Sequence, residues 1–155
     1  MSEREKKLES LGYPLNYVAK EGALVDALVI DGPMIYASGQ VPFKDGVLVS
    51  KGKVPSEIPF DDATRAAALC AANVLRAVRH AIGSLDRIDR IVRITGYVNS
   101  DPGFTDQHLV INGASQLVRD VFGEAGRHAR TALGMAQLPL GASTEIEMIL
   151  RLKVD

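Results

Sequence analysis

The stretch that decides the fold covers residues 130–154 and reads RTALGMAQLPLGASTEIEMILRLKV. Its second part, residues 144–154, alternates between apolar and polar side chains, which is the pattern of a β-strand with one buried face. Its first part, residues 130–136, also predicts a strand, and Pro139-Leu140-Gly141 predicts a turn between the two. We therefore expect two strands of one sheet here.

Two helices are predicted upstream of this stretch, over residues 59–83 and residues 104–122. Apolar residues share one stripe of the first helix: Ala67, Ala71, Val74, Val78 and Ile82. The opposite stripe is polar and is expected to face solvent: Arg65, Asn73, Arg76 and His80. Gly113 interrupts the second helix, where it predicts close packing or a kink.

The remaining elements complete the order. Residues 2–11 predict a short surface helix, with Ser2 and Glu5 at the spacing of a capping box. Residues 24–31 and 34–38 predict two strands joined by an Asp-Gly turn, and residues 91–98 predict another strand. The order is typical of an α+β fold with two main helices on one face of a mixed sheet. The other face needs a cover, and another copy of the chain is the expected one.

Size and composition exclude several classes of protein. The 155 residues predict a single domain, 1–155, in which residues 1–22 form an N-terminal helical extension and linker. The net charge of −1 lacks the basic bias of a nucleic-acid binder. No apolar run approaches the roughly 20 residues needed to span a bilayer, and the charged N-terminus is unlike a signal peptide. We therefore expect a cytoplasmic protein without a membrane partner.

General catalytic motifs are absent from the sequence. It contains no phosphate-binding loop, no nucleophile elbow and no pair of closely spaced cysteines. The single cysteine, Cys70, lies in an alanine-rich run and is expected to be a buried, inert thiol. The histidines, His80, His108 and His128, are too widely separated for a metal-ligand pattern, so no metal site is expected.

What remains is a set of short segments in a fixed order. Ser38-Gly39-Gln40-Val41-Pro42 follows the second predicted strand, and Asn112-Gly113 lies in the second helix. The uninterrupted run RTALGMAQLPLGASTEIE covers residues 130–147. In this order the segments resemble the Rid (YjgF-like) family of reactive-intermediate deaminases, and the resemblance extends over residues 24–154, nearly the whole chain.

The resemblance implies a chorismate-mutase-like α+β fold, a homotrimer, and ligand clefts between subunits. For the founding branch of the family it also implies hydrolysis of 2-aminoacrylate and related 2-imino acids to 2-keto acids and ammonia. It implies no cofactor and no metal. The expected partner is then a small metabolite that carries a carboxylate.

Arg130 matches the substrate-binding arginine of the family. Its planar, permanently charged guanidinium can grip a carboxylate through two parallel hydrogen bonds. Small residues on its predicted face, Ala132, Gly134 and Ala136, would leave a cavity beside it. The alternative is a purely structural role for Arg130, as a salt-bridge or helix-end partner.

The other candidate site residues follow from the resemblance. Glu145 matches the glutamate that holds the attacking water, a role within reach of a carboxylate. Its alternative is an ordinary solvent-facing strand residue. Gly39 matches a position where the backbone approaches the ligand, and Ser38 would line the same cleft. Asn112 matches a helix asparagine of the pocket, and Ala132 is expected to act through its backbone carbonyl.

The chain also departs from the founding branch. Val25 stands where a tyrosine closes over the substrate in that branch, and the N-terminal helix and a longer loop before the first main helix are additional. These departures indicate a divergent subgroup. They leave a non-catalytic module that binds a carboxylate metabolite as an alternative to a deaminase. An endoribonuclease is the less favoured third reading because the chain lacks a basic, aromatic surface.

Overall fold

The computed structural model describes residues 1–19 and 22–154. Its main feature is a five-stranded mixed sheet in the order β1-β2-β7-β5-β6. The strands are β1 Leu28–Asp31, β2 Met34–Gln40, β5 Ile88–Asn99, β6 Ala129–Met135 and β7 Thr144–Leu152. Only the β5–β6 pair among these is parallel. The small hairpin of β3, Phe43–Lys44, and β4, Val47–Leu48, lies apart from this sheet.

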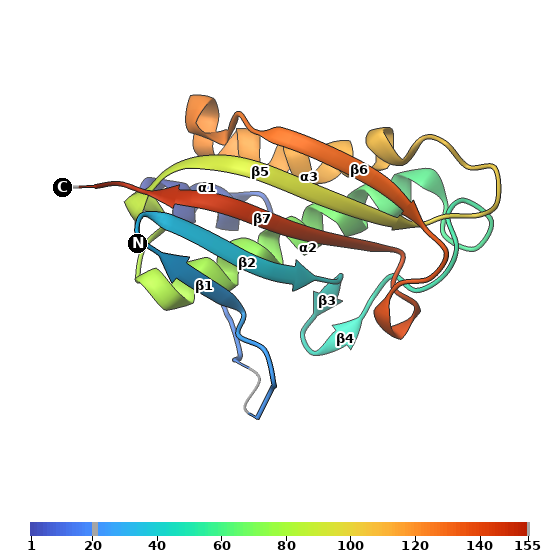
Figure 1. Ribbon diagram of the computed structural model, residues 1–155, viewed down its shortest axis with the longest axis horizontal. Helices are drawn as coiled ribbons and strands as arrows, with labels where there is room; N and C mark the ends of the chain where they lie inside the picture. Colours follow the sequence, from blue (N-terminus) through green and yellow to red (C-terminus); the bar gives the residue numbers. More distant parts are fainter. Residues whose placement is uncertain (20–21, 155) are drawn as a thin grey trace.

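The helices all lie behind the sheet in Figure 1. The two long ones are α2, Phe60–Ile82, and α3, Gln107–Phe122, and the short α1, Glu3–Ser10, packs against α3. Three short 3₁₀ turns complete the elements: η1 Leu85–Arg87, η2 Gly123–Gly126 and η3 Pro139–Gly141. The predicted α+β architecture, with two main helices on one face of a mixed sheet, is confirmed.

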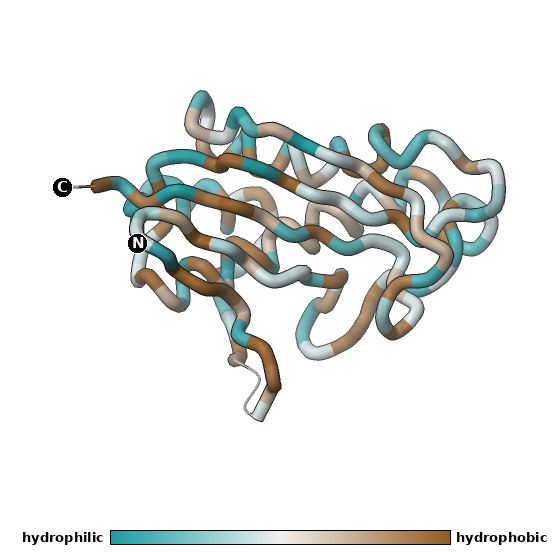
Figure 2. The backbone as a smooth tube through the Cα atoms, in the orientation of Figure 1, coloured by the Kyte–Doolittle hydropathy of each residue, from teal (hydrophilic) through white to brown (hydrophobic). Residues whose placement is uncertain are grey.

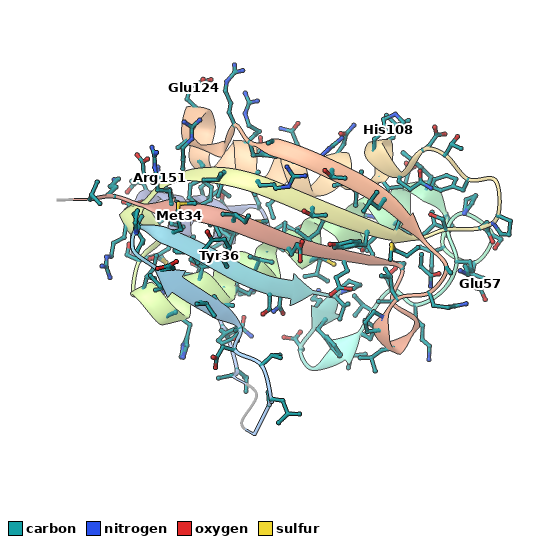
Figure 3. The ribbon with its side chains drawn as sticks, in the orientation of Figure 1. Met34, Tyr36, Glu57, His108, Glu124 and Arg151 are labelled. Carbon is teal, nitrogen blue, oxygen red and sulfur yellow. The ribbon has the colours of Figure 1, made fainter. Side chains whose placement is uncertain are left out.

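Each strand alternates between the two faces of the sheet. On β7, Ile146, Met148 and Leu150 are buried against the helices, whereas the residues between them are only partly buried. Apolar and polar colours alternate accordingly along the strands in Figure 2. The face away from the helices, which we call the open face, carries Tyr36 on β2, and Figure 3 labels it there. No described segment of the chain covers that face.

Gly113 is placed where α3 meets α2. A side chain at this position would overlap the backbone carbonyl of Thr64 on α2. Glycine therefore allows the two helix backbones to approach closely, as the sequence predicts. The N-terminal helix also begins as expected, because Ser2 and Glu5 form a reciprocal capping box.

Two expectations about local structure are wrong. The first concerns residues 24–31: β1 begins only at Leu28, and Leu24 and Val25 are exposed. Ahead of Leu28 the contact with β2 continues only through Ser38, whose backbone N–H donates to the Ala27 carbonyl at 2.9 Å. The next carbonyl, that of Asp26, accepts from the Ser38 hydroxyl at 2.6 Å, so a side chain takes the place of a backbone partner and the regular ladder ends.

The second concerns the polar stripe of α2, where Asn73 and Arg76 are buried. The Asn73 side-chain amide donates to the carbonyl groups of Val41, at 3.1 Å, and Phe43, at 2.9 Å. Arg76 donates to the Pro14 carbonyl at 2.6 Å. Loops from distant parts of the chain therefore cross this stripe. The two polar side chains donate hydrogen bonds to loop carbonyl groups that lose contact with water where the loops pack on the helix.

Cys70 is fully buried on α2, as predicted. Burial raises the pKa of its thiol to about 12, so the nucleophilic thiolate form is suppressed at neutral pH. Within residues 1–19 and 22–154, no helix is long and apolar enough to cross a membrane.

Candidate functional site

Arg130 lies on β6 and points toward α3. Its strand register places it beside Ile94, a fully buried residue on the helix-covered face of β5. One guanidinium nitrogen, Nη1, donates to Asn112 Oδ1 at 2.8 Å and to Ser115 Oγ at 3.0 Å. The other, Nη2, donates to the His108 carbonyl at 3.0 Å. Three acceptors from successive turns of one helix thus fix the plane of the guanidinium.

None of these acceptors carries a charge. Arg130 takes part in none of the ion pairs formed among the described residues. Burial lowers the pKa of Arg130, which nevertheless stays protonated because guanidinium loses its proton only at extreme pH. Of its five N–H groups, the Nε–H and one Nη2–H bond to no acceptor among the described residues and can bind a ligand. This half-buried cation can therefore accept a carboxylate.

His128 extends the network behind Arg130. Its Nδ1 lies 2.7 Å from the Gly126 carbonyl, and its Nε2 lies 2.9 Å from Ser115 Oγ. A carbonyl can only accept, so Nδ1 carries the proton. Burial, followed by the charges of Arg130 and Arg119, lowers the pKa of His128. The neutral ring then accepts from the Ser115 hydroxyl, which leaves the serine oxygen free to accept from Arg130.

A second cluster lies on the open face around Glu145. The Glu145 carboxyl rests against the backbone of Gly39, where any side chain would overlap its oxygen. Glycine is therefore required at this point of β2 if Glu145 keeps its place. Tyr97 lies opposite Glu145 in the β5–β7 ladder, and its hydroxyl donates to Glu147 at 3.0 Å.

The proton affinities in this cluster are raised. Burial and then the neighbouring charge of Glu147 raise the pKa of Glu145. Burial, the hydrogen bond to Glu147 and the charges of both glutamates raise the pKa of Tyr97. A carboxylate with raised proton affinity is a better proton acceptor near neutral pH, which suits a group that must activate water.

Arg130 and Glu145 lie on opposite faces of the sheet. Arg130 pairs through Ile94 with Met148, which is two strands away and three residues along β7 from Glu145. Sheet spacings put the two Cα atoms on the order of 14 Å apart. One small substrate cannot touch both residues within one chain, so each cluster is half of any site that uses both.

The other candidate residues divide between these clusters. Asn112 belongs with Arg130, and Gly39 belongs with Glu145. Ser38 uses its hydroxyl to bind the Asp26 carbonyl at 2.6 Å. Ala132 packs against the core from the Arg130 face of β6. Val25 is exposed in the loop before β1 and has three-quarters of its surface free, at 74%.

At Gly134, one of the small neighbours of Arg130, the expected space is occupied, because the Gln107 amide nitrogen lies where a side chain on Gly134 would stand. A surface hollow of about 400 Å³ borders Asn112 and Ser115, two of the residues that accept hydrogen bonds from Arg130. Six residues line it: Asn112, Ser115, Gln116, Arg119, Arg127 and His128. In the part of the chain that is described, no cluster of three potential metal ligands occurs.

Sequence reasoning missed four members of the two clusters: Ser115, His128, Tyr97 and Glu147. A signal existed for Ser115, since it follows Asn112 by three residues and so shares its helix face. The pairing of Tyr97 with the glutamates had no such signal, because it depends on the register between β5 and β7.

The chain is similar to several known proteins over most of its length. The chain is 39% identical over 146 residues to Protein TCP17 of Trypanosoma cruzi, covering 94% of this chain and 91% of that one. It is 44% identical to the crystal structure of Atu1372 from Agrobacterium tumefaciens, a protein described as having unknown function. That match has a TM-score of 0.89 and covers 98% of this chain and 93% of the other.

Two further solved structures show how similarity varies within the group. A putative endoribonuclease of Shewanella oneidensis shares 28% identity and a TM-score of 0.91, with 97% and 100% of the chains covered. One from Thermotoga maritima shares 27% identity and a TM-score of 0.59, with 88% and 91% covered. Residues 5–151 match the family model described as "YjgF/chorismate_mutase-like, putative endoribonuclease". The chain therefore belongs to the YjgF/chorismate-mutase-like family.

Proposed function

We propose that this protein hydrolyses 2-imino acids to 2-keto acids and ammonia at a site formed between copies of the chain. The observation that carries the proposal is the state of Arg130, a half-buried cation held by three uncharged acceptors and paired with no described carboxylate. Such a group suits the carboxylate that every 2-imino acid carries.

The reaction follows from the groups at hand. Arg130 binds the substrate carboxylate and orients the neighbouring imine carbon. Glu145 accepts a proton from a water molecule, whose oxygen adds to that carbon while the C=N electrons move to nitrogen. The nitrogen then takes protons and leaves as ammonia, and the C=O of the keto acid forms. The raised pKa of Glu145 suits both the removal and the return of a proton.

A second copy of the chain would supply the missing half of each site. The separation of Arg130 and Glu145 within one chain makes an inter-subunit cleft necessary if both touch the substrate. The open face supports this assembly because it exposes apolar side chains that include Val29 and Tyr36. We propose a homotrimer, the closed assembly expected for this family. Each of its interfaces would combine Arg130 of one copy with Glu145 of the neighbouring copy.

The direct test uses 2-aminoacrylate released by a dehydratase, with keto-acid formation followed over time. The wild-type protein should accelerate the reaction. Arg130→Ala should lower kcat/KM by at least about 100-fold, which is the scale of a lost charged hydrogen bond. Arg65→Ala removes an equally charged but exposed arginine from α2 and should leave the rate unchanged. No acceleration by wild type over Arg130→Ala would overturn the deaminase proposal.

A non-catalytic carboxylate-binding module is the second candidate. Val25 favours it, because an exposed valine in a loop stands where the founding branch has a tyrosine that closes the site. In a thermal-shift series with keto acids, Arg130-dependent stabilisation without turnover of any imine would support this role.

Ribonuclease activity ranks third. The family description names it, but the net charge of −1 is unlike the electrostatics of proteins that bind RNA through its backbone. Cleavage of single-stranded RNA at low salt by the wild-type protein, abolished in Arg130→Ala, would move this function to first place.

A further inference from the structure

We infer that the hollow bordered by Asn112 and Ser115, two acceptors of Arg130, receives the acidic side chain of the ligand. The preferred ligands are then 2-imino and 2-keto acids with a second carboxylate. The inference rests on the proposed function, since it assumes that Arg130 holds the first carboxylate. It adds a specificity-determining residue, Arg119, which lies outside the Arg130 contacts.

One face of α3 connects the Arg130 contacts with the hollow. His108, Asn112, Ser115 and Arg119 follow one another at intervals of three or four residues and so share one helix face. Arg130 bonds to the first three of these positions. Arg119 lies seven residues beyond Asn112, which is about 10 Å along the helix axis. Arg130 is held in place by its three acceptors, whereas the exposed Arg119 side chain can extend along this distance toward the second carboxylate of a short diacid.

The charges around the hollow favour an anionic group. Three basic residues line the hollow, but two of them are otherwise engaged. Arg127 is paired with Glu124 at 2.7 Å, and the pKa of His128 is lowered, so its ring is neutral at physiological pH. Arg119 is exposed and forms none of the ion pairs among residues 1–19 and 22–154. It is the cation of this hollow that remains available for an anionic group.

The polar lining and the size of the hollow suit a charged substrate side chain. All six side chains around the hollow are polar, so an aliphatic substrate side chain would gain no apolar surface there. The volume of about 400 Å³ exceeds the needs of a three-carbon imino acid. It accommodates a carboxymethyl or carboxyethyl group together with several waters, each of which occupies about 30 Å³.

Calorimetric titration with stable keto acids tests the inference on the full-length protein. The probes are 2-oxoglutarate, which has the second carboxylate, and 2-oxobutyrate, which lacks it. Wild type should bind 2-oxoglutarate at least about tenfold more tightly, as expected for one additional charge-assisted pair. Arg119→Gln should remove this preference and leave the affinity for 2-oxobutyrate unchanged. Arg65→Gln, the matched control on α2, should retain the preference.

Equal affinity of wild type for both probes, or an unchanged preference in Arg119→Gln, would overturn the inference. So would a failure of wild type to bind either acid. The proposed function is judged separately by the 2-aminoacrylate assay, because that substrate has a single carboxylate and needs no contact with Arg119. Circular dichroism of each variant confirms that the fold is intact.

Discussion

The two faces of the one sheet hold the two halves of the candidate site in different ways. On the helix-covered face, Arg130 is bound by three acceptors of α3 and backed by Ser115 and His128. On the open face, Glu145 lies over Gly39 beside a second carboxylate, with no described segment above it. The Arg130 network is therefore formed within one chain, whereas the Glu145 cluster faces away from the helices.

The difference shows what strand alternation does to a site built on a sheet. Residues 130 and 145 belong to neighbouring parts of one motif, yet side chains on successive strand positions point to opposite faces. The register across β6, β5 and β7 sends Arg130 toward the helices and Glu145 away from them. A single chain therefore carries both halves of the candidate site, but on opposite faces of its sheet.

The largest expected effect concerns the stability of the covered face. Ile94 is fully buried on β5, whereas its neighbour Thr95 points to the open face. Ile94→Ala should lower the free energy of unfolding by about 3 kcal/mol, and Thr95→Ala by less than about 1 kcal/mol. Urea unfolding at fixed protein concentration measures both values. Equal losses would mean that the two faces are equally packed.

The next effect concerns what covers the open face. Tyr36 is exposed on β2 at its centre, so Tyr36→Glu should place a charge in the contact with another copy. Association should weaken by at least about tenfold, because an unpaired buried charge costs more than 1.4 kcal/mol. Light scattering after size exclusion measures the change. Val47→Glu, an exposed apolar position outside the main sheet, is the control and should not alter the mass.

A smaller effect is expected at Gly39. The added methyl group of Gly39→Ala would overlap the Glu145 carboxyl and displace it from its place over β2. We expect kcat/KM for 2-aminoacrylate to fall by about tenfold, mainly in kcat, since Arg130 would still bind the carboxylate. An unchanged kcat would show that the position of Glu145 does not matter for turnover.

The smallest effect is a shift in pH dependence. Glu145 must be ionised to accept a proton, so activity should fall as the pH drops through its raised pKa. Glu147→Gln removes the like charge that contributes to this rise, which lowers the pKa of Glu145. The acidic limb of the kcat/KM profile should then move to lower pH, by less than about one unit. A shift to higher pH would contradict the assigned electrostatics.

The sequence predicts most of the fold because strong patterns coincide with real burial. The alternation in β7 and the alanine stripe of α2 depend on local periodicity, and both elements form where expected. The burial of Asn73 and Arg76 could not be foreseen, because the loops that cover them come from residues far away in the chain. The site shows the same limit, since motif order identifies Arg130 and Glu145 but does not reveal that the register places them on opposite faces.

Mixed oligomers test whether Arg130 of one copy acts together with Glu145 of a neighbouring copy. Arg130→Ala and Glu145→Gln should each be inactive alone. Equimolar co-refolding of the two in a closed ring places an intact pair at about one quarter of the interfaces by random assembly. We expect the mixture to recover about one quarter of wild-type activity. If the mixture stays as inactive as its parts while forming oligomers of wild-type size, the two residues do not meet across an interface.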